Sequence, residues 1–357
     1  MQMEKMRICD ILQHEDRIGM KRTIAKVLVA LGCIGGIAAS AAQMANPTAS
    51  RPRGPLLLVT WFGSGSIALP RGEEWKPEML TLYDNGRRPV AQFSNDQERV
   101  SLSYILFENK SGTPTAQGCR EDAINPIVKK YGKVIYKRSD RNIKLEGGVE
   151  AATTAYTLDT GDAKVPHQRN LFAFAGNATT CAEVHLSSPI DSAEEAEQMQ
   201  KALAEFRPDV AYQPSAIDFF QLGQLLFKTS PGFSARYYRA SLDAMPAGGG
   251  FVAPRRIATD QLVMALGMSG DLKSSRDLAE KAVIADPDYP INYYNLACAD
   301  AEEGDAVSAR KHLQAAYDRR KFVLEGEKMP DASKDESLLK LKDNKAFWEF
   351  VMSLPKS

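Results

Sequence analysis

The sequence predicts an α+β domain, with an antiparallel sheet and flanking helices, followed by an all-helical repeat domain. Two observations lead to this prediction. Residues 55–210 contain several short runs in which apolar and polar residues alternate, the pattern of strands that bury one face. Residues 213–320 contain an internal repeat with an offset of 34 residues, visible where Gly270 and Asp271 align with Gly304 and Asp305.

Length and charge limit the classes of protein that fit. The chain has 357 residues, which is enough for two ordinary domains. It carries 45 Lys and Arg against 45 Asp and Glu, so no net positive charge would attract nucleic acid, and we expect no nucleic-acid partner. After residue 50 no segment has the roughly 18 consecutive apolar residues that a membrane span needs, so we expect no span in the mature chain.

Residues 1–42 are predicted to be a signal peptide. Lys21 and Arg22 precede an apolar run (residues 27–38), and small residues follow at 40–42, which is the order typical of secretory signals. The acidic residues of the first 19 positions are unlike the start of such a signal, which favours Met20 as the true start. An uncleaved anchor helix is the alternative. Residues 43–54 are interpreted as a linker, and we expect an exported protein, periplasmic or secreted.

The cysteines fit an oxidising compartment. Outside the predicted signal, Cys119, Cys181 and Cys298 remain, and two of three can pair after export. Cys119 and Cys181 lie in the same half of the chain, so we favour a disulfide between them. Cys298 is expected to pack as a small hydrophobic side chain on a helix.

Residues 55–210 are predicted to form six strands and two helices. One helix covers 119–132, broken or kinked at Pro126, and the other covers 188–208 with Ser192 as its N-cap and Glu195 completing a capping box. The expected strands are residues 56–62, 99–107, 133–137, 150–158, 170–176 and 181–187.

The helical half resembles the tetratricopeptide repeat. Its first unit carries an aromatic residue, then Leu-Gly, then a bulky residue, in Phe219, Leu222, Gly223 and Leu226. Two further units follow the same pattern with departures, since Thr259, Val263 and Asp300 occupy positions where the repeat has an aromatic, a small and a bulky residue. The resemblance implies stacked helical hairpins over residues 213–320. The amphipathic region 321–357 is interpreted as a C-terminal cap, or alternatively as an exposed helix that binds a partner.

By the same resemblance, the first helices of the three units line a concave groove that binds a peptide or protein partner. The predicted groove residues are Phe220, Gln224, Phe227, Asp260, Gln261, Met264, Met268, Ile291, Tyr294 and Asn295. Among them, only Asn295 matches the Lys and Asn clamp that related repeats use for a C-terminal carboxylate. The alternative is that these residues pack under a neighbouring segment of the chain.

The strand TTCAEVHLSSP and the helix ending LAEFRP make residues 55–210 similar to exported bacterial domains of the PsbP/Mog type, and GCREDAINP resembles a segment of uncharacterised exported bacterial proteins. These resemblances imply an adaptor or assembly role more often than an enzymatic one. We therefore expect a non-enzymatic interaction protein, with no catalytic residues, cofactor or metal. Cys181, Glu183 and His185 share one strand face, so a metal site there is conceivable, but we favour a polar strand face with one disulfide cysteine. The alternative function is a small-ligand or hydrolytic site, which a pocket lined by His185, Glu183 and Arg120 would favour.

Overall fold

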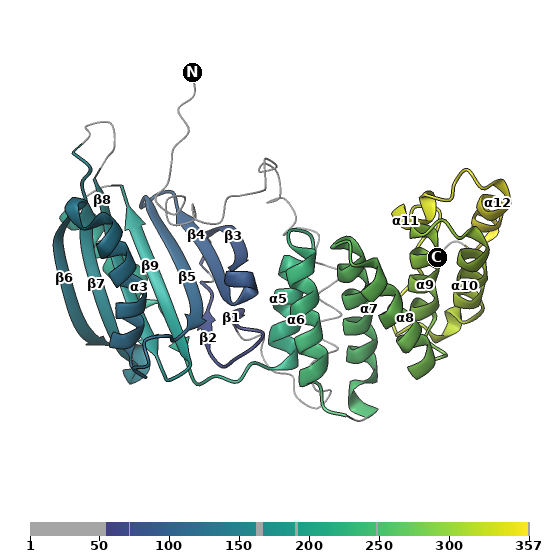
Figure 1. Cartoon of the computed structure of the whole chain (residues 1–357), viewed down its shortest axis with the longest axis horizontal. Coiled ribbons are helices and arrows are strands. Elements are labelled where there is room, and N and C mark those ends of the chain that lie inside the picture. The colour runs from purple at the N-terminus through teal and green to yellow at the C-terminus, as the bar shows by residue number, and fades with distance from the viewer. Residues whose placement is uncertain (1–54, 71, 162–166, 190–191, 248, 356–357) are drawn as a thin grey trace, which may run out of the picture. The chain divides into compact units, whose positions relative to one another are not determined.

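The computed structural model describes residues 55–70, 72–161, 167–189, 192–247 and 249–355. The predicted signal peptide (1–42) and linker (43–54) lie outside these residues. Within the described residues, the strands end at Asp209, and only helices and turns follow (Figure 1). The predicted order, an α+β part followed by a helical part, is confirmed.

Two antiparallel sheets form the first part. The strands are β1 (Leu57–Val59), β2 (Ser66–Ala68), β3 (Lys76–Tyr83), β4 (Arg88–Asn95), β5 (Val100–Glu108), β6 (Ile135–Lys144), β7 (Glu150–Leu158), β8 (Gln168–Gly176), β9 (Thr180–Ser188) and β10 (Pro208–Asp209). The larger sheet has seven strands in the order β3-β4-β5-β9-β8-β7-β6. The smaller sheet has three strands in the order β1-β2-β10.

Strand β9 lies at the centre of the larger sheet, and all of its residues are buried. Because successive side chains point to opposite faces, Val184 and Leu186 enter the main apolar core. The alternate positions Cys181, Glu183 and His185 point to the other face. The central strand therefore separates an apolar layer from a partly polar one.

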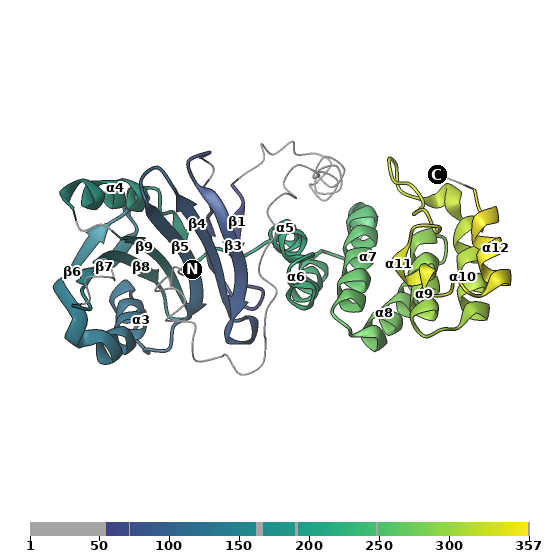
Figure 2. The same ribbon diagram turned by 90° about the horizontal axis from the view of Figure 1, so that it is seen from above.

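Helices α3 (Ala116–Tyr131) and α4 (Ala193–Ala204) cover opposite faces of this sheet (Figure 2). The Thr115 side chain caps α3 by accepting a hydrogen bond from the Gly118 N–H, 3.2 Å away. The predicted disulfide between Cys119 and Cys181 is present, and it fastens α3 to β9. On the other face, α4 places Met199 in the main core.

The first part differs from the prediction at its sheet edges. Strands β3 and β4 were not expected from the sequence, because each begins with a charged residue followed by proline, and β3 also contains a bulge beside Pro77. Strand β6 continues to Lys144, well beyond the predicted 133–137, because it is a polar edge strand without an apolar pattern. Helix α3 continues through Pro126, and α4 is shorter than the predicted 188–208.

The second part consists of three helical hairpins and two shorter helices. The helices are α5 (Ala216–Leu226), α6 (Pro231–Ala244), α7 (Val252–Met268), α8 (Leu272–Ala285), α9 (Pro290–Glu302), α10 (Ala306–Asp318), α11 (Glu336–Leu339) and α12 (Lys345–Ser353). The hairpins pair α5 with α6, α7 with α8, and α9 with α10.

Short 3-10 turns lie in both parts. They are η2 (Asp84–Gly86), η3 (Gly132–Val134) and η4 (Glu146–Gly148) in the first part, and η5 (Gly249–Phe251) and η6 (Arg320–Phe322) in the second.

The recurring Gly-Asp pair makes the turn in the second and third hairpins. Gly270 and Gly304 have φ of 86° and 81°, a left-handed conformation that ends a helix and favours glycine. Asp271 then caps α8 by accepting from the Ser274 N–H, and Asp305 caps α10 by accepting from the Ser308 N–H. The repeated pair therefore encodes a helix stop followed at once by a helix start.

Small residues let the two helices of a hairpin approach closely. A Cβ atom on Gly223 would lie 2.8 Å from the Tyr238 ring, so α5 needs glycine at this crossing. The hydroxyl of Ser234 donates to the Gly223 carbonyl oxygen at 2.7 Å. In the next hairpin, the Ser275 hydroxyl donates to the Val263 carbonyl oxygen at 2.9 Å. In both hairpins, a serine of the second helix therefore binds the backbone of the first helix.

The first hairpin packs against the strands. Val59 of β1 and Leu82 of β3 form one apolar cluster with Phe219 and Leu222 of α5 and with Tyr237 of α6, whose side chain is fully buried. The Tyr237 hydroxyl donates to the Val59 carbonyl oxygen at 2.8 Å. These contacts join the α5–α6 hairpin to the strands through its own apolar residues.

The segment after α10 folds back on the third hairpin. Helix α11 packs on α9, and α12 packs on α10. Leu338 of α11 and Phe347 of α12 are buried in a cluster with Tyr294 and Leu313. The apolar residues of 321–357 therefore cover the end of the helical part.

Candidate functional site

We use the term A-helix face for the surface formed by the first helix of each hairpin, α5, α7 and α9. It carries the ten residues that the sequence placed in a groove. The structure divides nine of these residues into a buried group, mainly on α9, and an accessible group on α5 and α7, and it places Asp260 at a contact between α7 and α9.

The buried group belongs mainly to α9. Ile291, Tyr294 and Asn295 are 4%, 3% and 8% exposed, and Phe220 of α5 is fully buried. The ring of Phe220 packs against Tyr238, with centroids 5.4 Å apart. These four side chains are used in packing, which matches the alternative that such residues lie under a neighbouring segment.

The accessible group belongs to α5 and α7. Met264 and Met268 lie one turn apart on α7 and are 41% and 53% exposed. Gln224 and Phe227 of α5 and Gln261 of α7 are partly exposed, and Gln261 Nε2 lies 4.0 Å from the Met264 sulfur. We call these five accessible residues, which comprise two flexible thioethers, one aromatic ring and two amides, the methionine surface.

Asp260 lies at the join between α7 and α9. Its Oδ1 accepts a hydrogen bond from Asn295 Nδ2 at 2.9 Å, so two predicted groove residues contact each other across the helices. Burial raises the pKa of Asp260 to about 6, and the negative charge of Glu327 adds to that effect, while the Asn295 hydrogen bond opposes it.

The segment from Val323 to Asp335 covers the inner side of α9. The Tyr289 hydroxyl donates to Glu327 Oε1 at 2.7 Å, and the Tyr294 hydroxyl donates to Asp335 Oδ2 at 3.1 Å. Leu324 packs against the apolar cluster that contains Leu262 of α7. Sequence reasoning missed Tyr289, Glu327 and Asp335, because no local pattern indicates that this loop returns to α9.

A charged cluster joins the second and third hairpins. Asp300 is 2% exposed, and its two oxygens accept from Arg276 Nη2 at 2.8 Å and pair with His312 Nδ1 at 2.6 Å. Arg276 also forms a bidentate pair with Glu303. Asp300 therefore replaces the bulky residue of the repeat with an ion pair that crosses between hairpins, and its second partner, His312, is half-buried.

The polar residues of β9 do not form an accessible site. Glu183 and His185 are 4% and 6% exposed. Burial raises the pKa of Glu183 to about 7, only partly opposed by Arg88, and lowers the pKa of His185 to about 4. His185 Nε2 lies 3.0 Å from Asn170 Oδ1, and its ring stacks on Phe172.

Cys181, the third member of the conceivable metal site, is in the disulfide. Within the part of the chain that the structure describes, no group of three or more His, Cys, Asp or Glu residues could hold a metal ion.

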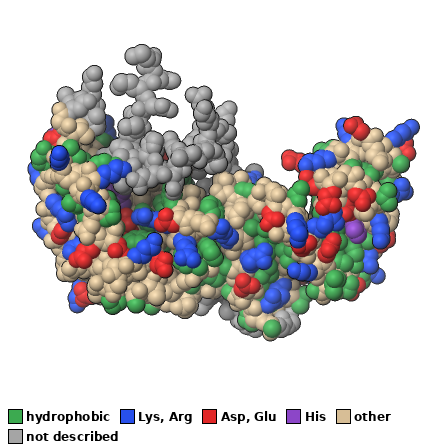
Figure 3. All heavy atoms as spheres, viewed as in Figure 1, with side chains coloured by type: hydrophobic (Ala, Val, Ile, Leu, Met, Phe, Trp, Pro, Cys, Tyr) green, Lys and Arg blue, Asp and Glu red, His purple; other side chains and the backbone are tan. Residues whose placement is uncertain are grey.

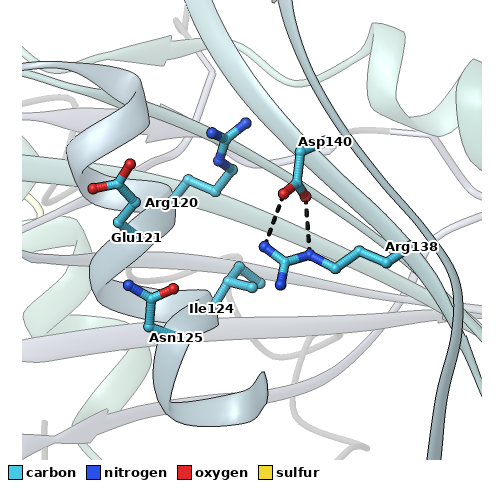
Figure 4. A pocket seen from close by; sticks show the side chains of 6 residues that line it. All are labelled: Arg120, Glu121, Ile124, Asn125, Arg138 and Asp140. Carbon is cyan, nitrogen blue, oxygen red and sulfur yellow. Dashed lines mark hydrogen bonds and ion pairs between the residues drawn. The ribbon is translucent and has the colours of Figure 1, made fainter. Parts of the chain in front are cut away.

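Arg120 lies elsewhere, in a pocket between α3 and β6 (Figure 4). Neither His185 nor Glu183 lines this pocket, so the three residues of the alternative function do not converge. The pocket is instead lined by Arg120, Glu121, Ile124, Asn125, Arg138 and Asp140.

Acidic and basic side chains are interspersed on the face shown in Figure 3. Among the described residues, no helix has both the length and the apolar character to cross a membrane. No protein-family model matches this chain, and no curated protein matches it.

Proposed function

We propose that this is an exported, non-enzymatic interaction protein whose tetratricopeptide-like hairpins bind a peptide or protein partner at the methionine surface. One observation carries the proposal: Met264 and Met268 are exposed side by side on α7, in a helical part where most large apolar side chains are buried. Methionine has a flexible, polarisable side chain that adapts to varied apolar partners, which suits a binding surface.

The chain's own C-terminal segment supports the proposal by analogy. On α9, the loop from Val323 to Asp335 combines an apolar anchor, Leu324, with carboxylates that accept hydrogen bonds from tyrosine hydroxyls. Helix α11, which carries Leu338, packs on α9. On the neighbouring helix α7, Met264 and Met268 remain exposed and Gln261 remains partly exposed. A partner segment with apolar side chains and backbone groups for Gln224 and Gln261 would fit this surface.

Export is supported by the disulfide between Cys119 and Cys181, because such bonds persist in oxidising compartments. It also rests on the signal peptide that the sequence predicts before residue 43. The adaptor role that the PsbP/Mog-type resemblance implies for residues 55–210 agrees with a protein that brings partners together outside the cytoplasm.

Site-specific crosslinking tests the proposal. A photoreactive phenylalanine analogue is placed at Met264 or Met268 in the chain expressed in its own host. The matched controls are Ile284 of α8 and Val307 of α10, which are each 82% exposed on the second helices of the hairpins. We expect the two α7 positions to yield one and the same crosslinked partner and the two control positions to yield none.

A pair of double variants separates binding from general surface effects. M264E/M268E should lose the partner on purification, whereas I284E/V307E should retain it, because both pairs add the same charge to exposed positions. The proposal is wrong if all four crosslinking positions give the same products, or if both double variants recover the partner equally.

A further inference from the structure

The pocket between α3 and β6 is built mainly from charged and polar side chains. It has a volume of about 280 Å³ and lies between one turn of α3 and the edge strand of the larger sheet. In Figure 4, the side chains of Arg120 and Arg138 approach Asp140 from the two sides of the pocket. Such a volume can hold a small polar molecule.

The hydrogen-bond acceptors of Asp140 are already occupied. Arg138 Nε and Nη2 donate to its two oxygens at 3.3 and 2.8 Å, and Thr154 Oγ1 donates to Oδ1 at 2.8 Å. Burial raises the pKa of Asp140, but the hydrogen bonds from Arg138 and Thr154 outweigh it, so the net pKa lies below its ordinary value. The carboxylate therefore serves to orient Arg138.

Arg120 differs from Arg138 because it forms no hydrogen bond or ion pair with any residue that the structure describes. The guanidinium group offers five N–H donors, and Arg138 keeps its Nη1 group after binding Asp140. Glu121, the second carboxylate of the lining, is exposed and already accepts from Gln117 Nε2 at 2.8 Å. The pocket thus has more unused donors than unused acceptors.

The position of Arg120 is fixed by the fold. It follows Cys119 directly, and the disulfide to Cys181 anchors that turn of α3 on the sheet. Arg138 is held by Asp140 on β6, opposite α3. The two guanidinium groups are therefore carried by anchored elements on both sides of the cavity, which lowers the entropy cost of binding a ligand between them.

We propose that this pocket binds a small molecule through a carboxylate or phosphate group held between Arg120 and Arg138. The planar fork of a guanidinium matches both oxyanions with paired, charge-assisted hydrogen bonds. The amide of Asn125 and the buried side chain of Ile124 also line the pocket. This site is separate from the methionine surface and does not depend on the proposed partner binding.

Calorimetric titration of the full chain with inorganic phosphate, and separately with citrate, tests the proposal. The key variant is Arg120→Gln. Its matched control is Arg141→Gln, an exposed arginine on the same strand as Arg138 that does not line the pocket. We expect saturable binding of at least one anion, weakened about tenfold or more by Arg120→Gln and unchanged by Arg141→Gln, because a hydrogen bond to a charged group contributes about 1.5–3 kcal/mol.

The two anions distinguish the ligand classes, since tighter binding of citrate indicates a carboxylate ligand and tighter binding of phosphate a phosphorylated one. A thermal unfolding curve and a free-thiol assay confirm that Arg120→Gln keeps its fold and disulfide. The proposal is overturned if the wild-type chain binds neither anion saturably, or if both arginine variants weaken binding equally, as a general charge effect would.

Discussion

Helices α7 and α9 occupy equivalent places in consecutive repeats, but α7 exposes side chains on its A-helix face whereas α9 buries them. At the offset of 34 residues, Met264 aligns with Cys298 and Met268 with Glu302. The two methionines are exposed, whereas Cys298 is partly buried with its thiol 3.7 Å from Asp335 Oδ1, and Glu302 pairs with Lys340. The same position is a free surface in one hairpin and an internal contact in the next.

A repeat pattern therefore assigns a residue to a helix face but does not decide which segment covers that face. Residues 323–341 return to α9 and occupy it, with Leu338 fully buried there. Leu324 of that segment packs against the cluster that contains Leu262 of α7, whereas Met264 and Met268 stay exposed. The proposed binding surface therefore lies on the part of the A-helix face that the chain itself leaves open.

The largest expected effect comes from loosening the cover on α9. Leu338→Ala removes a fully buried side chain and should lower the free energy of unfolding by about 3 kcal/mol, since large-to-small core substitutions leave a cavity. Met352→Ala, at a position 53% exposed on α12, should change it by less than about 0.5 kcal/mol. Urea denaturation followed by circular dichroism measures both, and equal costs would show that α11 does not cover α9.

The next effect tests the charged join between the hairpins. Arg276→Ala should cost about 2 kcal/mol, because it leaves the buried carboxylate of Asp300 with only His312. Arg310 is the equivalent residue of the third hairpin, where its guanidinium lies 4.8 Å from the Phe350 ring centroid. Arg310→Ala should cost less than about 1 kcal/mol. Thermal denaturation of both variants checks the ranking, and a larger loss from Arg310→Ala would contradict it.

Two glycines test the close helix crossing. Gly223→Ala should destabilise the chain by about 1–2 kcal/mol, because its Cβ would meet the Tyr238 ring at 2.8 Å. Gly267→Ala in α7 has its nearest contact at 3.6 Å and should be neutral or stabilising by up to about 1 kcal/mol, through higher helix propensity. Denaturant midpoints compare the two. Loss of stability in both variants would mean that glycine is needed generally in these helices.

The last prediction concerns the pH dependence of stability at the hydrogen bond between Asp260 of α7 and Asn295 of α9. Because the folded pKa of Asp260 is raised to about 6, the folded state binds its proton more tightly than the unfolded state, and this carboxyl makes folding less favourable as pH rises from about 4 to 6. Asp260→Asn keeps an oxygen for Asn295 and removes that titration. Its stability relative to wild type should increase by about 2 kcal/mol between pH 4 and pH 7.

Stability curves at several pH values measure that difference. A constant offset between Asp260→Asn and wild type over the whole range would show that Asp260 is not desolvated. Glu183 has a raised pKa in both chains, so its contribution cancels when the two are compared.

The candidate site was predicted only in part, and the reason is visible in single residues. The resemblance to the tetratricopeptide repeat implied that Met264, Met268 and Gln261 line a groove, and in the structure the two methionines are exposed and Gln261 is partly exposed. It could not show that Tyr294 would bond Asp335, 41 residues later, because that contact depends on the path of a loop without a pattern. Arg120 was noted in the sequence, but its partners in the pocket, Arg138 and Asp140, come from a polar edge strand that alternation cannot detect.

By itself, the sequence determined the local structure of this protein. Glycine at positive φ, aspartate as N-cap and small residues at helix crossings act over a few residues, so they can be read directly along the chain. The bridge between Cys119 and Cys181 was favoured on a different ground, because only three cysteines follow the predicted signal and these two lie in the same half of the chain. Which faces stay open depends on the tertiary structure, because covering a surface requires contacts between segments far apart in the chain, such as Leu338 on α9 and Tyr237 on β1.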